Sequence, residues 1–324
     1  MNGLKKQFEV SIGDSTAYAG MQIEMKKNAV FIHQKAYLQR VLQRFGMENC
    51  KPMPTPADPL VKLSKADPKV RSPGVPFREL IGSLMYLAIV SRPDIAYAVS
   101  VLSQYMSGWD KSHWTAGKRV LHYLQGTQEV GIAYNRSDGI LTAFSDSDYA
   151  NDPQTRRSRT GTVLLLSGGP VIWCSNKQTI VTLSSAEAEF VAANNAVTNI
   201  KWMHLMLEEI GVRVTRTVLL IDNQPTIKII RNPEFHMRTK HIDIRYKYIR
   251  EKYQQELFDV KYVPSAQQLA DIFTKPLHSG RMPQLCLQSL NQRSEAVIGS
   301  GGSVVVVIRC ASDGRNERMV RESR

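Results

Sequence analysis

The pattern of hydrophobic and polar positions changes near residue 140. Downstream of that point, short apolar runs typical of strands alternate with stretches in which apolar residues recur at helical spacing. The expected strands are 140–146, 160–166, 170–175, 216–222 and 257–263, and the expected helices are 185–210, 224–231, 241–255 and 266–274. This order predicts an α/β domain over residues 140–277, with one mixed five-stranded sheet and flanking helices.

The first 48 residues predict a mixed α+β segment. Residues 8–12 have the pattern of a strand, and residues 21–25 and 29–33 could form a hairpin across Lys26-Lys27-Asn28. Residues 35–45 follow with helical spacing. We therefore treat 1–48 as one unit.

The remaining segments differ in composition. Seven of the fifteen prolines fall in residues 49–76, which predicts a linker. Three apolar stripes at helical spacing predict a helical region over 77–135. Residues 278–324 combine a glycine-rich stretch with an arginine-rich end and show no periodicity, so we expect a disordered tail.

The composition limits the class of protein. A formal net charge of +13 and a pI of about 9.6 favour a polyanionic partner. The four cysteines form no CxxC pair, so neither a zinc site nor a disulfide framework is indicated, and a reducing compartment is expected. No apolar run reaches 18 residues and the N-terminus has no signal-peptide pattern, so no membrane association is expected.

Four acidic residues stand where strands end or helices begin: Asp146, Glu189, Asp222 and Asp271. Buried carboxylates are unfavourable unless they are paired or bind cations. If the fold gathers these four, their oxygens would form the hard-ligand site that Mg²⁺ prefers.

Each acid also has a purely structural interpretation. Ser184 and Glu187 match a capping box, which gives Glu187 a structural use and leaves Glu189 as the candidate ligand, with Glu187 as the alternative. Asp222 could cap the helix that follows it. Asp271 could be a favourable acid in the first turn of a helix that starts with a second capping box at Ser265.

Several motifs resemble the RNase H domain of copia-type retrotransposon Pol polyproteins. They are Phe144–Ala150, Arg157–Gly161, Ser184–Ala192, Asp222–Asn223, Arg238–Ile244 and Gln268–Lys275. Upstream, Phe77–Leu87, Arg92–Ile95, His113–Trp114 and Leu121–Thr127 resemble the C-terminal part of the reverse transcriptase of the same family. The resemblance implies an RNase H-like fold preceded by a truncated reverse-transcriptase region, with 1–48 as the end of its palm and 77–135 as a thumb or connection.

The resemblance also implies a function. It assigns metal-ligand and catalytic roles to Asp146, Glu189, Asp222 and Asp271, with two Mg²⁺ ions, or Mn²⁺ as a substitute, cleaving the RNA strand of RNA–DNA hybrids. The expected contacts to the nucleic acid are Arg157, Arg159, Ser184, Ser185, Asn223, Arg238, Lys240 and His241. In this family an intracellular, cytoplasmic location in virus-like particles is expected.

Two departures from the family pattern matter. No Asp-Asp pair occurs in the chain, so the polymerase signature is absent and no DNA synthesis is expected without the upstream polymerase core as a partner. The segment before Asp271 also lacks the histidine that many RNases H carry there, and the sequence does not decide whether His236 or His241 replaces it. The alternative function is a catalytically decayed binding module; the oligomeric state stays open.

Overall fold

The computed structural model describes residues 16–67, 74–135, 140–232, 240–282 and 291–292. The strand expected at 8–12 and most of the tail expected at 278–324 lie outside these residues. Within the described ranges, no helix has both the length and the apolar character needed to cross a membrane.

The expected mixed sheet is present, with the strand order β7-β6-β5-β8-β9. Its strands are β5 (Thr142–Asp148), β6 (Arg159–Leu166), β7 (Gly169–Lys177), β8 (Thr217–Ile221) and β9 (Phe258–Tyr262). β5, β6 and β7 pair antiparallel, whereas β8 runs parallel to both β5 and β9. This arrangement confirms the predicted RNase H-like sheet.

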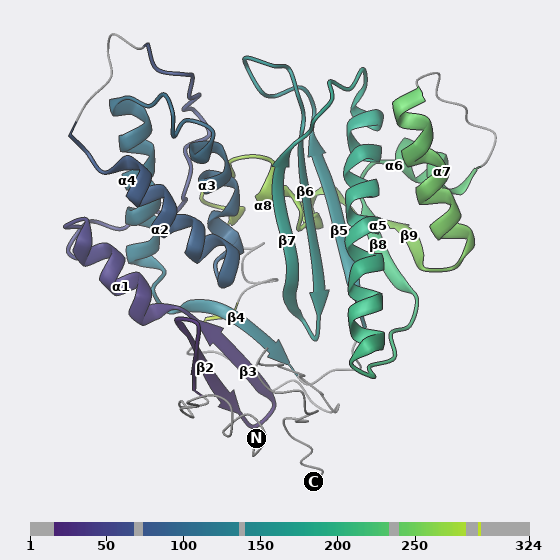
Figure 1. The fold of residues 1–324 in the computed structure, drawn as a ribbon, viewed down its shortest axis with the longest axis horizontal. Helices are drawn as coiled ribbons and strands as arrows, with labels where there is room; N and C mark the ends of the chain where they lie inside the picture. The colour runs from purple at the N-terminus through teal and green to yellow at the C-terminus, as the bar shows by residue number, and fades with distance from the viewer. Residues whose placement is uncertain (1–15, 68–73, 136–139, 233–239, 283–290, 293–324) are drawn as a thin grey trace, which may run out of the picture.

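Helices cover one face of this sheet, as Figure 1 shows. They are α5 (Ser185–Glu209), α6 (Gln224–Arg231) and α7 (Lys240–Gln254). Because side chains alternate along a strand, Ala143 and Leu164 pack against α5, while Phe144 and Val163 point to the opposite face. That opposite face carries the four-residue helix α8 (Asp271–Thr274).

The prediction of one helix over 266–274 is wrong. Residues Ser265–Gln267 form a single 3-10 turn, and only α8 is α-helical. The predicted capping box at Ser265 does not form, because its hydroxyl donates to Asp222 Oδ2 (2.8 Å) and the Gln268 side chain donates to the Ser145 carbonyl (3.0 Å). Tertiary hydrogen bonds therefore replace the local capping bonds.

A second sheet has the order β1-β2-β3-β4-β10. Its strands are β1 (Ala17–Tyr18), β2 (Met21–Lys26), β3 (Ala29–His33), β4 (Val130–Asn135) and β10 (Asn291–Gln292). β2 and β3 are the hairpin expected from the sequence. β4, which ends the region expected to be helical, is a strand because its backbone pairs with β3 from Ala29 to Ile32.

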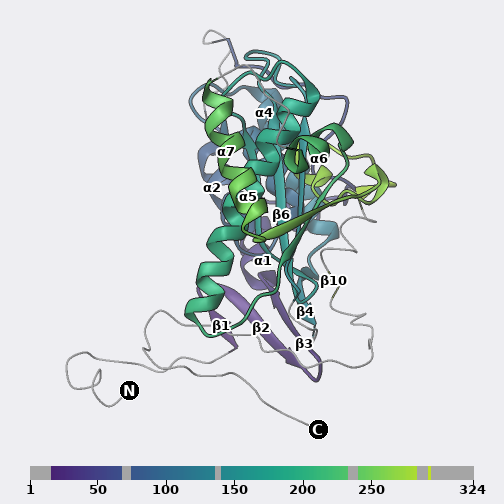
Figure 2. The same cartoon turned by 90° about the vertical axis from the view of Figure 1, so that its right-hand side faces the viewer.

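A group of helices lies in the chain between β3 and β4 of the second sheet, and beside the sheets in space (Figures 1 and 2). They are α1 (Lys35–Arg44), α2 (Phe77–Val90), the 3-10 turn η2 (Pro93–Ile95), α3 (Ala96–Ser103) and α4 (Lys111–Gly126). The helices match the apolar stripes in the sequence. Asp110 caps α4 by accepting from the amides of Ser112 and His113.

The helical part and the five-stranded sheet share one core. Phe144 and Val163 of the sheet and Phe273 of α8 belong to the same buried cluster as Leu84 and Leu102 of the helices. Hydrogen bonds join the two parts directly: Trp173 Nε1 donates to the Ala88 carbonyl (2.8 Å) and Ser100 Oγ to the Ser175 carbonyl (2.6 Å). Tyr134 Oη of β4 in the second sheet also donates to the Pro170 carbonyl (2.8 Å). The second face of the sheet is therefore covered by the helical part.

A buried ion pair fixes the helices to one another. Arg92 and Asp94, 2% and 0% exposed in their side chains, pair at 2.7 Å through Nη2 and Oδ2. Arg92 also donates to the carbonyl (2.9 Å) and hydroxyl (2.6 Å) of Thr127, and Tyr123 donates to Asp94 (2.7 Å). Two charges can remain in the interior here because each is hydrogen-bonded to further polar groups.

We predict that Asp94→Ala destabilises the fold by about 3–5 kcal/mol, because it leaves the Arg92 charge buried and uncompensated. Urea unfolding measures the change. The control is Glu79→Gln at the exposed pair Arg44–Glu79, where we expect a loss below about 1 kcal/mol. Equal losses in the two variants would contradict the role assigned to the buried pair.

Candidate active site

Three carboxylates meet at the edge of the five-stranded sheet. One oxygen each from Asp146 on β5, Glu189 on α5 and Asp222 after β8 lie within 4.8 Å of one another. Asp146 and Glu189 are 4% and 6% exposed, and Asp222 is half-buried. Parallel pairing of β5 with β8 and the packing of α5 on β5 bring these distant positions together.

Burial and neighbouring like charges act strongly on Glu189. Burial is the main cause that raises its carboxyl pKa well above the ordinary value, and the charges of Asp146 and Asp222 raise it further. Its Oε1 accepts from the Ser147 amide (3.2 Å), but its Oε2 is buried and has no hydrogen-bond partner among the residues that the structure describes. A buried oxygen without a donor favours a cation beside it.

Asp271 lies on the other side of Asp146. It is fully buried, and its carboxylate forms ion pairs with Lys275 Nζ (2.6 Å, to Oδ1) and with Arg281 Nη2. Burial and the nearby Asp146 charge raise its pKa, while Lys275 opposes that rise. Asp271 thus belongs to the same electrostatic cluster, although it is not one of the three acids grouped around a common point.

Hydrogen bonds show which residues take the structural roles considered for Glu187 and Asp222. Glu187 Oε2 accepts from the Leu183 amide (2.6 Å), a structural use at the start of α5. Asn223, rather than Asp222, caps α6 by accepting from the Thr226 amide (3.0 Å). Glu189 and Asp222 do not take these roles, and both belong to the group of three carboxylates.

Several residues around the acids were not foreseen. Thr274 donates its hydroxyl to Asp146, and Lys275 Nζ lies 4.0 Å from Asp146 Oδ2. Gln178 donates to Ser147 Oγ (3.2 Å) and to the Ala188 carbonyl (3.0 Å), so it links β5 to α5 beside Glu189. Thr274 and Lys275 lie in the motif Gln268–Lys275, and Lys275 also stands four residues after Asp271, whereas Gln178 lies in none of the motifs.

The predicted nucleic-acid contacts are placed unequally. Ser184 and Ser185 are exposed at the start of α5, and Arg157 is half-buried at the turn between β5 and β6. Arg159 is 7% exposed, and its guanidinium donates to Ser100 (2.8 Å) and to the Ser175 carbonyl (3.2 Å).

The other predicted contacts fall at or beyond the limit of the described structure. Asn223 is half-buried, and its side-chain oxygen is occupied by the α6 cap. Arg238 and His236 lie outside the described residues, and so do the side chains of Lys240 and His241, which open α7. The question of an assisting histidine therefore stays a prediction.

The chain is similar to transposon proteins over most of its length. It is 36% identical over 300 residues to the retrovirus-related Pol polyprotein from transposon TNT 1-94 of Nicotiana tabacum, covering 90% of this chain and 22% of that polyprotein. It is also 36% identical over 280 residues to that from transposon RE1 of Arabidopsis thaliana, covering 86% of this chain and 19% of the relative. The chain thus spans about a fifth of the length of these curated relatives.

A structural comparison gives a weaker likeness. A crystal structure of LC11-RNase H1 in complex with RNA/DNA hybrid matches with a TM-score of 0.32 and 9% identity, covering 41% of this chain and 93% of that one. No family model matches the chain. On the strength of the sequence relatives, the chain belongs to the family of retrovirus-related Pol polyproteins from transposons, which confirms the copia-type resemblance.

Gly161 controls how closely α8 approaches the acids. It pairs with Asp146 across β5 and β6, and a Cβ there would lie 2.7 Å from the Ala270 carbonyl and 2.7 Å from Thr274 Cγ2. We predict that Gly161→Ala destabilises the protein by about 1–3 kcal/mol, because α8 must move away from the sheet. Thermal unfolding measures this loss.

The matched control is Gly82→Ala in α2, where an added Cβ meets nothing within 4 Å. Because alanine favours a helix interior, this variant should be neutral or more stable by up to about 1 kcal/mol. A Gly161→Ala protein as stable as the wild type would contradict the close approach of α8.

We also predict opposite effects of two glutamate substitutions on α5. Without divalent ions, Glu189→Gln should raise the melting temperature, because it removes a buried charge that faces Asp146 and Asp222. Mg²⁺ at a hundredfold excess over its Kd should stabilise a wild-type site by about 2.7 kcal/mol and this variant far less.

Glu187→Gln is the control for that experiment. Its carboxylate serves the Leu183 amide, so we expect no gain in melting temperature and an unchanged response to Mg²⁺. Scanning calorimetry with and without Mg²⁺ measures both variants. A lost Mg²⁺ response in Glu187→Gln, with a normal response in Glu189→Gln, would reverse the assignment.

Proposed function

We propose that this chain carries a ribonuclease H centre that hydrolyses the RNA strand of RNA–DNA hybrids. The observation that carries the proposal is the meeting of Asp146, Glu189 and Asp222 at the edge of an RNase H-like sheet in a member of the Pol polyprotein family. Hydrolysis of a phosphodiester needs stabilisation of charge on the attacking and leaving oxygens, which carboxylates alone do not provide.

The donor set fits divalent metal ions. Three carboxylates offer hard oxygens within 4.8 Å of one another, and the buried Glu189 Oε2 has no other partner. Asp146, Glu189 and Asp222 would hold the ion, with Asp271 as the candidate fourth ligand beside Asp146. Two Mg²⁺ ions, when bound, would activate water and stabilise the leaving oxygen.

The protein's own residues would fix the geometry. Thr274 orients Asp146 from α8, the Ser147 amide orients Glu189, and Ser265 orients Asp222. Supporting hydrogen bonds of this kind hold ligand oxygens in place before a metal binds. Around them, exposed Ser184 and Ser185 and half-buried Arg157 would contact the nucleic-acid backbone, which positions the substrate without reading its sequence.

One observation favours a second candidate function. Both oxygens of Asp271 lie against cations, Lys275 and Arg281, so this acid is already neutralised by the protein. A chain in which Asp271 stays in these pairs could bind a hybrid without cutting it. The alternative is therefore a nucleic-acid-binding module.

We predict that the full chain with Mg²⁺ cleaves only the RNA strand of a labelled hybrid, and that Asp146→Asn lowers the rate by at least about a hundredfold. The full chain is used because α8 and β7 pack against the helical part. The control Asp259→Asn, on β9 and outside the cluster, should keep the activity. Product analysis on a denaturing gel reads both strands.

The outcomes separate the two candidates. Binding of the hybrid without cleavage by a folded wild-type protein would support the binding module. Absence of both binding and cleavage would contradict both. Cleavage that survives in Asp146→Asn would mean that a different site performs the reaction.

A further inference from the structure

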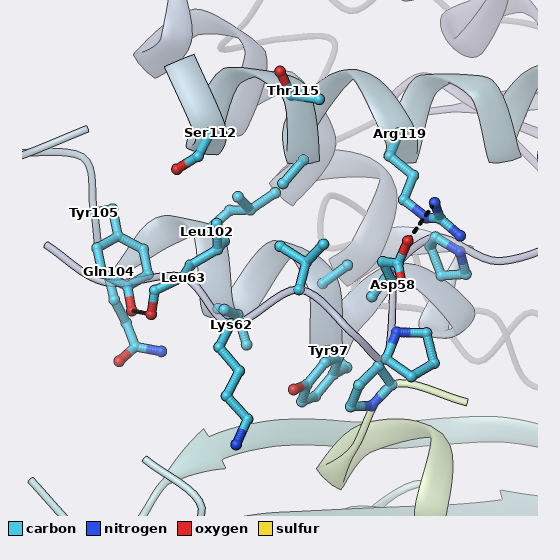
Figure 3. Close-up of a pocket in the computed structure, with 18 of the residues that line it drawn as sticks. Asp58, Lys62, Leu63, Tyr97, Leu102, Gln104, Tyr105, Ser112, Thr115 and Arg119 are labelled. Carbon is cyan, nitrogen blue, oxygen red and sulfur yellow. Dashed lines mark hydrogen bonds and ion pairs between the residues drawn. The ribbon is translucent and has the colours of Figure 1, made fainter. Parts of the chain in front are cut away.

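A large cavity lies beside the candidate active site, and of the backbone contacts proposed above only Arg157 lines it. Its volume is about 920 Å³, and it separates the helical part from the turn between β5 and β6. One wall consists of α3, α4 and the segment 53–63, and the opposite wall includes Asp148, Arg157 and Lys177. Figure 3 shows the first wall, with Lys62 pointing away from α4 toward the sheet.

The segment 53–63 is held in place by side-chain and backbone contacts with α4 and with Tyr105. Arg119 of α4 forms an ion pair with Asp58 (3.1 Å) and donates to Thr55 (3.0 Å). Tyr105 donates to the Leu63 carbonyl (3.0 Å), and the Met53 amide donates to the His122 carbonyl (3.2 Å). The proline-rich stretch expected as a linker is therefore held along α4 in its described part, which makes the cavity a fixed feature.

The lining carries more basic than acidic residues. Seven of the lining residues are Lys or Arg and three are Asp. Arg119 pairs with Asp58, Lys177 pairs with Asp152 (2.8 Å), and Arg159 is used in packing. Four cations have no acidic partner in the part of the chain that the structure describes: Lys62, Lys111, Lys118 and Arg157. Such an excess attracts a polyanion.

The same cavity offers aromatic surface. The half-buried rings of Tyr97 and Tyr105 line it, next to the aliphatic side chains of Val101 and Leu102. Flat rings combined with unpaired cations are the features by which proteins bind single-stranded nucleic acids, the bases stacking while the cations hold the phosphates. A free inorganic anion would contact the cations but has no base to stack on the aromatic rings.

The size excludes a duplex. Cavities of about 300–1,000 Å³ are typical of sites for small molecules, so this one takes a few unpaired nucleotides rather than a turn of double helix. It also adjoins the acids: Asp148 lies two residues beyond Asp146 on the same side of β5, and Pro276 follows Lys275, which pairs with Asp271.

We infer that this cavity binds the single-stranded extension of a nucleic acid whose duplex part lies at the carboxylate cluster. The inference rests on the proposed function for the position of the duplex. The cations hold the phosphates of the unpaired strand, and Tyr97 and Tyr105 face its bases. The chain thereby prefers hybrids with an overhang to blunt hybrids.

The test measures affinity without cleavage, in the full chain carrying Asp146→Asn. Fluorescence anisotropy compares a blunt RNA–DNA hybrid with hybrids that carry a four-nucleotide extension of DNA or of RNA, at either end. We expect the favoured overhang to raise affinity by on the order of tenfold, the effect of about one stacked base. The DNA and RNA arms show which strand enters.

Substitutions then locate the effect. Lys62→Glu with Lys118→Glu, and separately Tyr105→Ala, should reduce the ratio of overhang to blunt affinity toward one. Lys201→Glu on α5, away from the cavity, is the matched control and should keep the ratio. Circular dichroism checks that each variant is folded, and Lys62, which is exposed, can be changed with little risk to the fold.

Each result has a defined meaning. A ratio near one in the starting protein, or a ratio unaffected by the cavity variants, would overturn the inference even if the wild type cleaves hybrids. A clear overhang preference in a chain whose wild type does not cleave would support the inference about the cavity and contradict the proposed nuclease function. Failure to bind either hybrid would overturn both.

Discussion

The close contact between α8 and β6 is the constraint on which the candidate site depends. Gly161 has no side chain, so the Ala270 carbonyl and Thr274 can approach the strand opposite Asp146. Phe273 packs into the shared core, and Ser175 Oγ donates to its carbonyl (2.6 Å). Backbone packing therefore holds Asp146 and Asp271 together, against the repulsion between their charges.

That repulsion explains how the polar groups are distributed. Lys275 and Arg281 neutralise Asp271, whereas on the opposite side of Asp146 no protein cation is paired with Glu189 or Asp222 among the described residues. Among the described residues, Glu189 Oε2 also has no hydrogen-bond partner. Burial and like charges raise the pKa of Glu189 for the same reason. Cationic side chains therefore offset the charge of Asp271, whereas the charges of Glu189 and Asp222 are suited to an external cation.

The sequence predicted the regular elements well because period and propensity are local properties. The strands β5 to β9 and the helices α5, α6 and α7 begin and end within two residues of their predicted bounds. The prediction failed where tertiary contacts decide. Ser265 donates to Asp222 and Gln268 donates to Ser145, so neither takes part in the predicted capping box. The guanidinium of Arg159 donates to Ser100. The acids could be chosen from motifs. The bond of Thr274 to Asp146 and the position of Gln178 could not be predicted, because only the fold brings these side chains near the acids.

The helix α3 contacts both the core beneath the candidate active site and the basic cavity. Its Val99 and Leu102 belong to the core that supports α8, its Ser100 bonds Ser175 and Arg159 at the sheet, and its Tyr97 lines the basic cavity. A shift of α3 would therefore disturb the acids and the cavity together, since protein interiors are too densely packed to absorb the movement locally. The helical part is for this reason best regarded as a component of the candidate site, and the sheet alone would lack the cover of its second face.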